Sequence, residues 1–202
     1  AQEAGVSIGT VSGVLNGKKT IKPQNYRRVM DAVQKLDYRP NMLARSLRTN
    51  ITGSIGLIIP DITNPYYPEL ARGVEDMARK AGVTLFLCNS DRDVDKEWGY
   101  AQALAQKQVD GIIIAKPHIS LEQLNMLRRK CRIVLVDGTA EQLGEFDLVS
   151  VDNRSGAASA IDLLLSYGHR KIAFVGGIIE SQSMQDRLDA YRSVLEKSGI
   201  PY

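Results

Sequence analysis

The chain is short of the residues on which many catalytic and metal sites depend. Its 202 residues include two cysteines and two histidines, and Cys88, Cys131, His118 and His169 are scattered along the sequence. Two distant cysteines, each near an apolar stretch, indicate reduced core thiols rather than a disulfide framework. The histidines give no metal-ligand cluster, so we expect no metal and no cofactor.

Long apolar runs and a charged, apolar leader are also missing. No run approaches the roughly 18 residues of a membrane span, so we expect no membrane partner. Because no leader precedes the folded pattern, we expect a cytoplasmic protein. With 44% hydrophobic and 24% charged residues, the composition is that of ordinary globular material with enough length for more than one unit.

Positive charge is concentrated in the first quarter of the chain. Residues 1–50 carry nine Lys or Arg and three Asp or Glu, a net charge of +6, while residues 51–202 carry a net charge of −3. A basic segment on a mildly acidic body is typical of a phosphate-binding module joined to a ligand-binding module. A solvent-exposed charged surface would explain any single lysine, but it explains poorly why the positive charge is concentrated in residues 1–50.

The first seventeen residues fit a helix-turn-helix motif. Gly5 can adopt the positive φ that a sharp turn between helices requires, and Ser7 can cap the following helix. Apolar residues then recur at helical spacing and are expected to face inward. The outer surface, which a recognition helix presents to the major groove, is expected to comprise Ile8, Gly9, Ser12, Gly13 and Asn16.

A further helix and a basic linker follow the motif. Pro23 marks the start of this helix, and apolar residues continue at helical spacing from Tyr26 to Leu36. After it come the segment Tyr38-Arg39-Pro40-Asn41 and a short basic stretch at 43–49. A small helical hairpin with a charged tail would produce part of this pattern, but the order and spacing of the segments are more specific.

From residue 54 onward, short apolar runs alternate with helical patterns, which predicts βαβ units and a doubly wound α/β fold with a parallel sheet. We expect strands at 55–59, 83–88, 111–115, 133–137, 148–152 and 172–175. Helices are expected around Leu70 to Ala81 and Trp98 to Ala105, and then at 155–167 and 183–198. Ligands of such folds bind beyond the carboxyl ends of the strands.

Polar and aromatic side chains gather after the predicted strands. Carboxylates, a guanidinium, hydroxyls and aromatic rings are suited to a small polyhydroxylated or planar polar ligand. The candidates are Asp61, Asn64, Tyr66, Tyr67, Asp137, Ser181, Ser183 and Arg187. Two alternatives stay open, because Asp61 and Asn64 can equally serve a turn and Tyr66 and Tyr67 can equally belong to the core.

Enzymatic chemistry on nucleotides or esters has little support. No Gly-x-Gly-x-x-Gly follows a predicted strand, and the glycine-containing segment 13–19 has the wrong spacing for a phosphate loop and lacks its Ser or Thr. A nucleophile elbow is absent as well. We therefore expect that the protein is not an enzyme and that it has no catalytic residues.

The helix-turn-helix, the Tyr38-Arg39-Pro40-Asn41 segment and the α/β body together resemble the lactose-repressor (LacI/GalR) family of bacterial transcription regulators. This resemblance implies a helix-turn-helix head at 1–38, a hinge helix and linker at 39–52, and an effector-binding core of the periplasmic-binding-protein type at 53–202. Within the core, the first lobe would span 53–147 and a partial second lobe 148–202. The implied function is that of a ligand-responsive repressor that binds a double-stranded DNA operator as a homodimer and holds a sugar-like effector between its lobes.

The resemblance also implies roles for single residues. Arg187 would supply a key contact to the effector. Ser7, Thr10, Ser12 and Asn16 would contact phosphates, Ile8, Gly9 and Gly13 would face the bases, Arg39 and Asn41 would anchor the hinge, and Ala44 and Leu47 would enter the minor groove.

The chain departs from the family pattern at both ends and in the head. Only four residues precede the turn, relatives continue past residue 202, and Gly13 stands where the family usually has an arginine that reads a base edge. We therefore expect a truncated member in which Ile161, Leu164, Val194 and Leu195 lack some packing partners. A periplasmic-type sugar-binding receptor shares the two-lobed fold and is the alternative, although the basic head argues against it.

Overall fold

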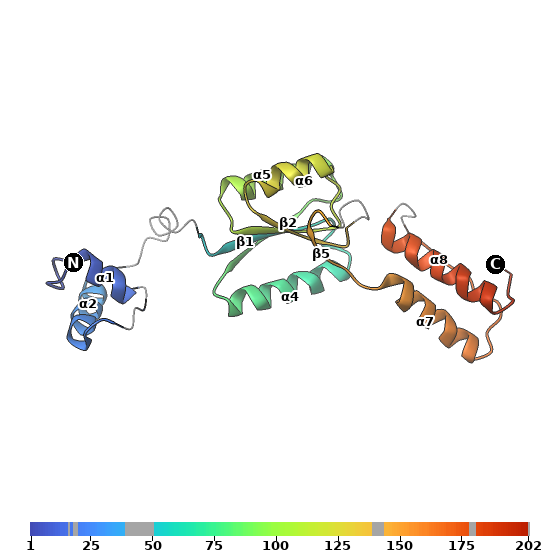
Figure 1. The fold of residues 1–202 in the computed structure, drawn as a ribbon, viewed down its shortest axis with the longest axis horizontal. Coiled ribbons are helices and arrows are strands. Elements are labelled where there is room, and N and C mark those ends of the chain that lie inside the picture. The colour runs from blue at the N-terminus through green and yellow to red at the C-terminus, as the bar shows by residue number, and fades with distance from the viewer. Residues whose placement is uncertain (16, 18–19, 39–50, 139–143, 178–180, 202) are drawn as a thin grey trace. The chain divides into compact units, whose positions relative to one another are not determined.

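The computed structural model describes residues 1–15, 17, 20–38, 51–138, 144–177 and 181–201, and the chain divides into two compact units, residues 1–52 and 53–202 (Figure 1). The predicted hinge helix lies outside the described residues. The roles expected for Asn16, Arg39, Asn41, Ala44 and Leu47 therefore stay predictions.

The first unit contains two helices around a small apolar core. A turn over residues 2–5 leads into α1 (Ile8–Leu15), and α2 (Pro23–Lys35) follows. Ala4, Val14 and Val29 are buried together between these segments, and Val29 is only 1% exposed. The apolar spacing predicted a helix from Pro23 onward, and that prediction is confirmed.

Five parallel strands form the sheet of the second unit. They are β1 (Ser54–Ile59), β2 (Thr84–Asn89), β3 (Gly111–Ala115), β4 (Arg132–Val136) and β5 (Asp147–Val149), in the order β2-β1-β3-β4-β5. Leu57 of β1 lies opposite Leu87 on one side and Ile113 on the other. The predicted parallel α/β fold is confirmed. The bounds of β3 are as predicted, those of β1, β2 and β4 differ by one residue, and β5 ends three residues earlier than predicted.

Helices cover both faces of this sheet, as Figure 1 shows. They are α4 (Tyr66–Lys80) on one face, and α5 (Val94–Gln106) and α6 (Leu121–Arg128) on the other. Side chains of β1 alternate between the two, because successive residues of a strand point to opposite faces. Ile58 packs with Leu104 of α5, whereas Leu57 and Ile59 pack with Ala71 of α4.

Two helices after the sheet pack against each other. These are α7 (Asn153–Ser166) and α8 (Gln182–Lys197), with Ile161, Val194 and Leu195 buried in their shared core. Leu164, which was expected to lack partners, is 38% exposed. No described helix combines the length and the apolar character that crossing a membrane requires.

Two elements differ from the secondary structure predicted from the sequence. Residues 172–175 were expected to form a strand, but they adopt no regular structure and Val175 is 93% exposed. A strand exists only beside a hydrogen-bonded neighbour, and no described strand pairs with this segment. Conversely, α6 was not expected, although Ser120 and Gln123 form a capping box at its start.

Gly56 permits the close approach of α5 to β1. A Cβ atom at this position would lie 2.5 Å from Cδ1 and 3.1 Å from Cδ2 of Leu104, which is itself 3% exposed. We expect Gly56→Ala to lower the free energy of unfolding by about 1–3 kcal/mol, because the core cannot accommodate the added methyl group. Urea-induced unfolding measures this change.

Gly73, in the middle of α4, is the matched control. A Cβ atom there meets nothing within 4 Å, so Gly73→Ala should raise the free energy of unfolding by about 0.5–1 kcal/mol through helix propensity. Equal effects of the two substitutions would contradict the packing assigned to Gly56.

Candidate functional site

The turn before α1 has the predicted structure. Gly5 has a φ of +58°, a left-handed conformation that costs glycine nothing. Ser7 caps α1, because its Oγ accepts a hydrogen bond from the backbone N–H of Thr10 at 3.2 Å. The same Oγ lies 3.0 Å from the Thr10 hydroxyl. These contacts satisfy an amide in the first turn and determine where α1 begins.

The exposed surface of α1 is small and uncharged. Ile8 is 79% exposed and Gly9 is exposed beside it, whereas Thr10 and Ser12 are partly buried. The predicted outward position of Gly13 is wrong, since this residue is buried along with Val14. A glycine carries no side chain that could extend past its neighbours, so Gly13 offers nothing to a base edge.

Basic side chains lie on α2 and directly before it. Lys22, Arg27 and Arg28 are exposed and form no ion pair with any described residue. Lys35 is engaged instead, with its Nζ 2.5 Å from Oε1 of Glu3. The hydrogen bond from Lys35 lowers the pKa of Glu3. Three cations of the described part of the head are therefore available to an external anion.

The second unit contains a cleft of about 460 Å³ at the carboxyl ends of the strands, a volume typical of small-molecule sites. Segments that follow β1 to β5 and the first turns of α4, α7 and α8 line it. Seven of the predicted ligand residues are brought together there: Asn64, Tyr66, Tyr67, Asp137, Ser181, Ser183 and Arg187.

Strained backbone marks the same edge of the sheet. Four non-glycine residues just after β2, β3 and β4 have positive φ angles, namely Asp91, Arg92, Lys116 and Asp137, with values of 54°, 61°, 49° and 58°. Such conformations are uncommon for residues with a Cβ and tend to persist at functional sites. Backbone hydrogen bonds hold two of them, from Lys116 N to Val136 O at 2.6 Å and from Asp137 N to Val149 O at 3.0 Å.

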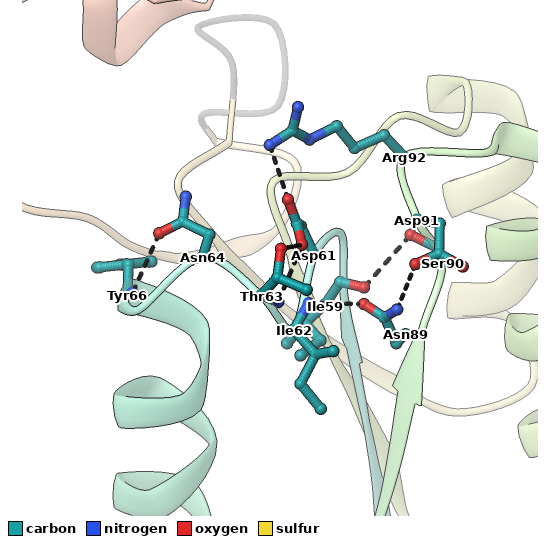
Figure 2. A network of polar contacts seen from close by, with 10 residues as sticks. All are labelled: Ile59, Asp61, Ile62, Thr63, Asn64, Tyr66, Asn89, Ser90, Asp91 and Arg92. Carbon is teal, nitrogen blue, oxygen red and sulfur yellow. Dashed lines mark hydrogen bonds and ion pairs between the residues drawn. The ribbon is translucent and has the colours of Figure 1, made fainter.

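Asp61 serves the turn after β1 rather than the cleft (Figure 2). Its Oδ1 accepts hydrogen bonds from the hydroxyl and the backbone N–H of Thr63 at 2.6 and 2.9 Å, and its Oδ2 accepts one from Arg92 Nη2 at 3.0 Å. The contacts with Thr63, and more weakly the charge of Arg92, hold the pKa of Asp61 below its usual value. Asp61 does not line the cleft, so its predicted role as a ligand residue is replaced by that of orienting Arg92.

The start of α4 brings an amide and two aromatic rings to the cleft. Asn64 Oδ1 accepts a hydrogen bond from the backbone N–H of Tyr66 at 3.1 Å, as Figure 2 shows. The rings of Tyr66 and Tyr67 meet edge to face with centroids 5.1 Å apart. Burial, with a smaller contribution from Asp137, raises the pKa of Tyr67 to about 12. Its hydroxyl therefore stays protonated near neutral pH and can donate a hydrogen bond.

Arg187 is oriented by a neighbouring amide. Its Nε donates a hydrogen bond to Oδ1 of Asn153 at 2.8 Å, and the Asn153 amide in turn donates to the carbonyl of Val151 at 3.2 Å. Asn153 is 9% exposed, so the acceptor side of this part-buried contact is sheltered, whereas Arg187 itself is exposed. The guanidinium is thus fixed at one edge, and its terminal nitrogens make no hydrogen bond to the described residues.

Glu97 anchors the segment that follows β3. This α5 side chain is 1% exposed and its Oε1 accepts hydrogen bonds from the backbone N–H groups of His118 and Ile119 at 3.1 and 3.3 Å. His118 Nδ1 lies 3.3 Å from Oε2. Because Lys116 is two residues earlier in the chain, Glu97 also restrains the position of Lys116 at the cleft.

Two family models match the chain and leave only residues 42–51 unmatched. Residues 52–202 match the model of periplasmic binding proteins and the sugar binding domain of the LacI family, and residues 1–41 match that of bacterial regulatory proteins of the lacI family. The chain belongs to the LacI family. The match of the head to regulatory proteins favours this assignment over the alternative of a periplasmic receptor.

Curated LacI-family relatives are similar along the whole chain. Catabolite control protein A of Priestia megaterium is 37% identical over 202 residues, which cover 100% of this chain and 61% of that protein. The ribose operon repressor of Halalkalibacterium halodurans is 39% identical over 203 residues, covering 99% and 59%. The chain therefore spans about three-fifths of the length of these relatives.

Solved structures show the same fold. The lac repressor dimer bound to operator and the anti-inducer ONPF matches with a TM-score of 0.82 at 21% identity, covering 100% of this chain and 61% of that chain. A LacI family transcriptional regulator from Enterococcus faecium with bound ribose matches with a TM-score of 0.65 at 32% identity, covering 73% and 54%.

Several cleft residues were missing from the LacI-type site predicted from sequence. They are Arg92, Lys116, Val151, Asn153, Gly177 and Met184. Lys116 directly follows the predicted strand at 111–115, and Arg92 comes four residues after the strand predicted to end at 88. The rule that ligands bind beyond the carboxyl ends of parallel strands could have identified both.

Removing the Glu97 carboxylate should destabilise this edge of the sheet. We expect Glu97→Ala to lower the free energy of unfolding by about 2–3 kcal/mol, because the buried amides of His118 and Ile119 lose their acceptor. Thermal or urea unfolding measures the change. Glu196→Ala on the exposed surface of α8 is the control, and an equally small effect of both substitutions would show that water satisfies these amides.

Proposed function

We propose that this LacI-family protein is a ligand-responsive, sequence-specific transcription regulator of the repressor type. In this proposal it binds a roughly palindromic double-stranded DNA operator as a homodimer, and a small sugar-like effector binds in the cleft. The observation that carries the proposal is the combination, in one chain, of a head of the regulatory type with a polar cleft at the sheet edge.

The surface of the head supports the DNA part of the proposal. Lys22, Arg27 and Arg28 are exposed cations that suit phosphates, and such contacts position a protein without reading sequence. Ile8 and Gly9 are the exposed residues at the start of α1 and form the surface that would face base edges in the major groove. Direct readout by long polar side chains is therefore limited on this helix.

The cleft supports the effector part. Asp137 can accept hydrogen bonds from hydroxyl groups, and Arg187 can donate to them in a fixed plane. Tyr66, which is 47% exposed, offers a ring edge or face to an apolar side of a sugar. The solved relative with bound ribose is consistent with an effector of this kind.

Binding to DNA should weaken steeply with salt. If the dimer neutralises about eight phosphates, log K should fall with log salt with a slope near −7, from roughly −0.9 per phosphate. Fluorescence anisotropy across a salt series measures this slope. The double variant Arg27→Gln/Arg28→Gln should flatten it, whereas Lys107→Gln, at the end of α5, should not. A slope near zero for the unsubstituted protein would contradict DNA binding by the head.

Arg187 should be required for effector binding but not for DNA binding. Charge-assisted hydrogen bonds of about 1.5–3 kcal/mol imply that Arg187→Ala weakens effector affinity roughly 10-fold to 150-fold. Titration calorimetry with an effector identified by thermal-shift screening measures the loss. Arg170→Ala, an exposed substitution away from the cleft, is the control. If Arg187→Ala binds the effector normally, this arginine serves only to hold Asn153.

A further inference from the structure

The described lining of the cleft carries more positive than negative charge. Its cations are Arg92, Lys116 and Arg187, and its one carboxylate is Asp137. Arg92 is already paired with Asp61 at 3.0 Å. The Nε of Arg187 contacts only a neutral amide, and Lys116 has no ion pair with a described residue. Among the described lining residues, two cations that are not in ion pairs therefore face one carboxylate, a charge balance that favours an anionic group on the ligand.

The dipole of one helix, α8, adds to this positive potential. The helices α4, α7 and α8 all begin at the cleft, since their first turns contribute to its lining. The N-terminus of a helix carries a partial positive charge. Glu69 in the first turn of α4 and the carboxylate of Asp152, which caps α7 by accepting a hydrogen bond from Ser155 N, offset this charge at two of the three helices. The first turn of α8 has no acidic residue and its N-cap is Ser181, so its positive end is not offset in this way.

Lys116 is held at the cleft by the fold itself. It is partly buried, and its φ of 49° is a conformation that is unfavourable for a lysine. The hydrogen bond from its backbone N–H to Val136 O at 2.6 Å fixes it on one side. On the other side, the contacts of Glu97 with His118 and Ile119 fix the chain that follows. These restraints act on the backbone and determine where the Lys116 side chain leaves the chain at the cleft.

We propose that the effector is anionic, a small polyhydroxylated molecule whose phosphate or carboxylate group binds Lys116 and Arg187. Asp137 then accepts hydrogen bonds from the hydroxyl groups of the same molecule. This inference rests on the proposed function, because it specifies the chemical class of ligand for the same cleft. Both anionic groups form charge-assisted hydrogen bonds with an ammonium and a guanidinium.

Matched pairs of sugars test the proposal on the purified chain. Titration calorimetry compares ribose with ribose 5-phosphate, and glucose with both glucose 6-phosphate and gluconate. We expect an anionic member to bind at least 10-fold more tightly than its neutral parent. Preference for the two phosphates alone identifies a phosphate ester as the ligand, whereas preference for gluconate alone identifies a carboxylate.

Substitutions at Lys116 assign the preference to this residue. Lys116→Gln should weaken binding of the preferred anion at least 10-fold and change binding of the neutral parent less than 2-fold, while Lys116→Arg should retain most of the preference. Lys107→Gln, an exposed lysine outside the cleft, should change neither. Equal losses for anion and parent in Lys116→Gln would mean that Lys116 acts on the shape of the cleft, and would overturn the proposal.

The outcomes separate this inference from the proposed function. If the neutral parents bind as tightly as the anions, or if no member binds at millimolar concentration, the anionic effector is excluded. DNA binding with the expected salt dependence still supports a regulator in that case. If an anion binds through Lys116 but DNA does not bind, the ligand class stands and the regulator proposal fails.

Discussion

All five strands of the sheet run parallel, and the arrangement of the cleft depends on this constraint. Parallel strands end at one edge, so segments that are far apart in the sequence reach the same place. The turn after β1 brings Tyr66 and Tyr67, the segments after β3 and β4 bring Lys116 and Asp137, and the start of α8 brings Arg187 close to them. Because its residues follow different strands, no single short sequence motif encodes this site.

Polar contacts, from buried to exposed, convert this placement into a defined geometry. Glu97 fixes the segment after β3, Asp61 fixes Arg92, and Asn153 fixes Arg187. Asp61 and Asn153 contact the cleft side chains of Arg92 and Arg187 directly, whereas Glu97 acts through the backbone of residues 118 and 119. Side chains restrained in this way lose less entropy on binding a ligand than free ones do. The positive φ angles at the strand ends agree with such a restrained site, because a strained backbone conformation persists only where the surrounding structure enforces it.

The sequence predicted most features that depend on local pattern, with α6 as an exception, and it missed several that depend on distant partners. Gly5 and Ser7 defined their turn correctly, because the φ angle and the cap are properties of neighbouring residues. A strand at 172–175 could not be decided locally, since it needs a neighbour to pair with. Asp61 was equally suited to a turn and to a ligand, and the structure shows that it binds Thr63 within the turn and, from a distant segment, Arg92.

In the proposed regulator, ligand binding in the cleft changes the affinity of the head for DNA. The direct measurement is the DNA affinity of the protein with and without saturating effector, together with the effector affinity with and without DNA. We predict that both affinities change by the same factor, in the range of about 5-fold to 150-fold that is typical of allosteric coupling. A DNA affinity that stays constant when the cleft is saturated would contradict this prediction.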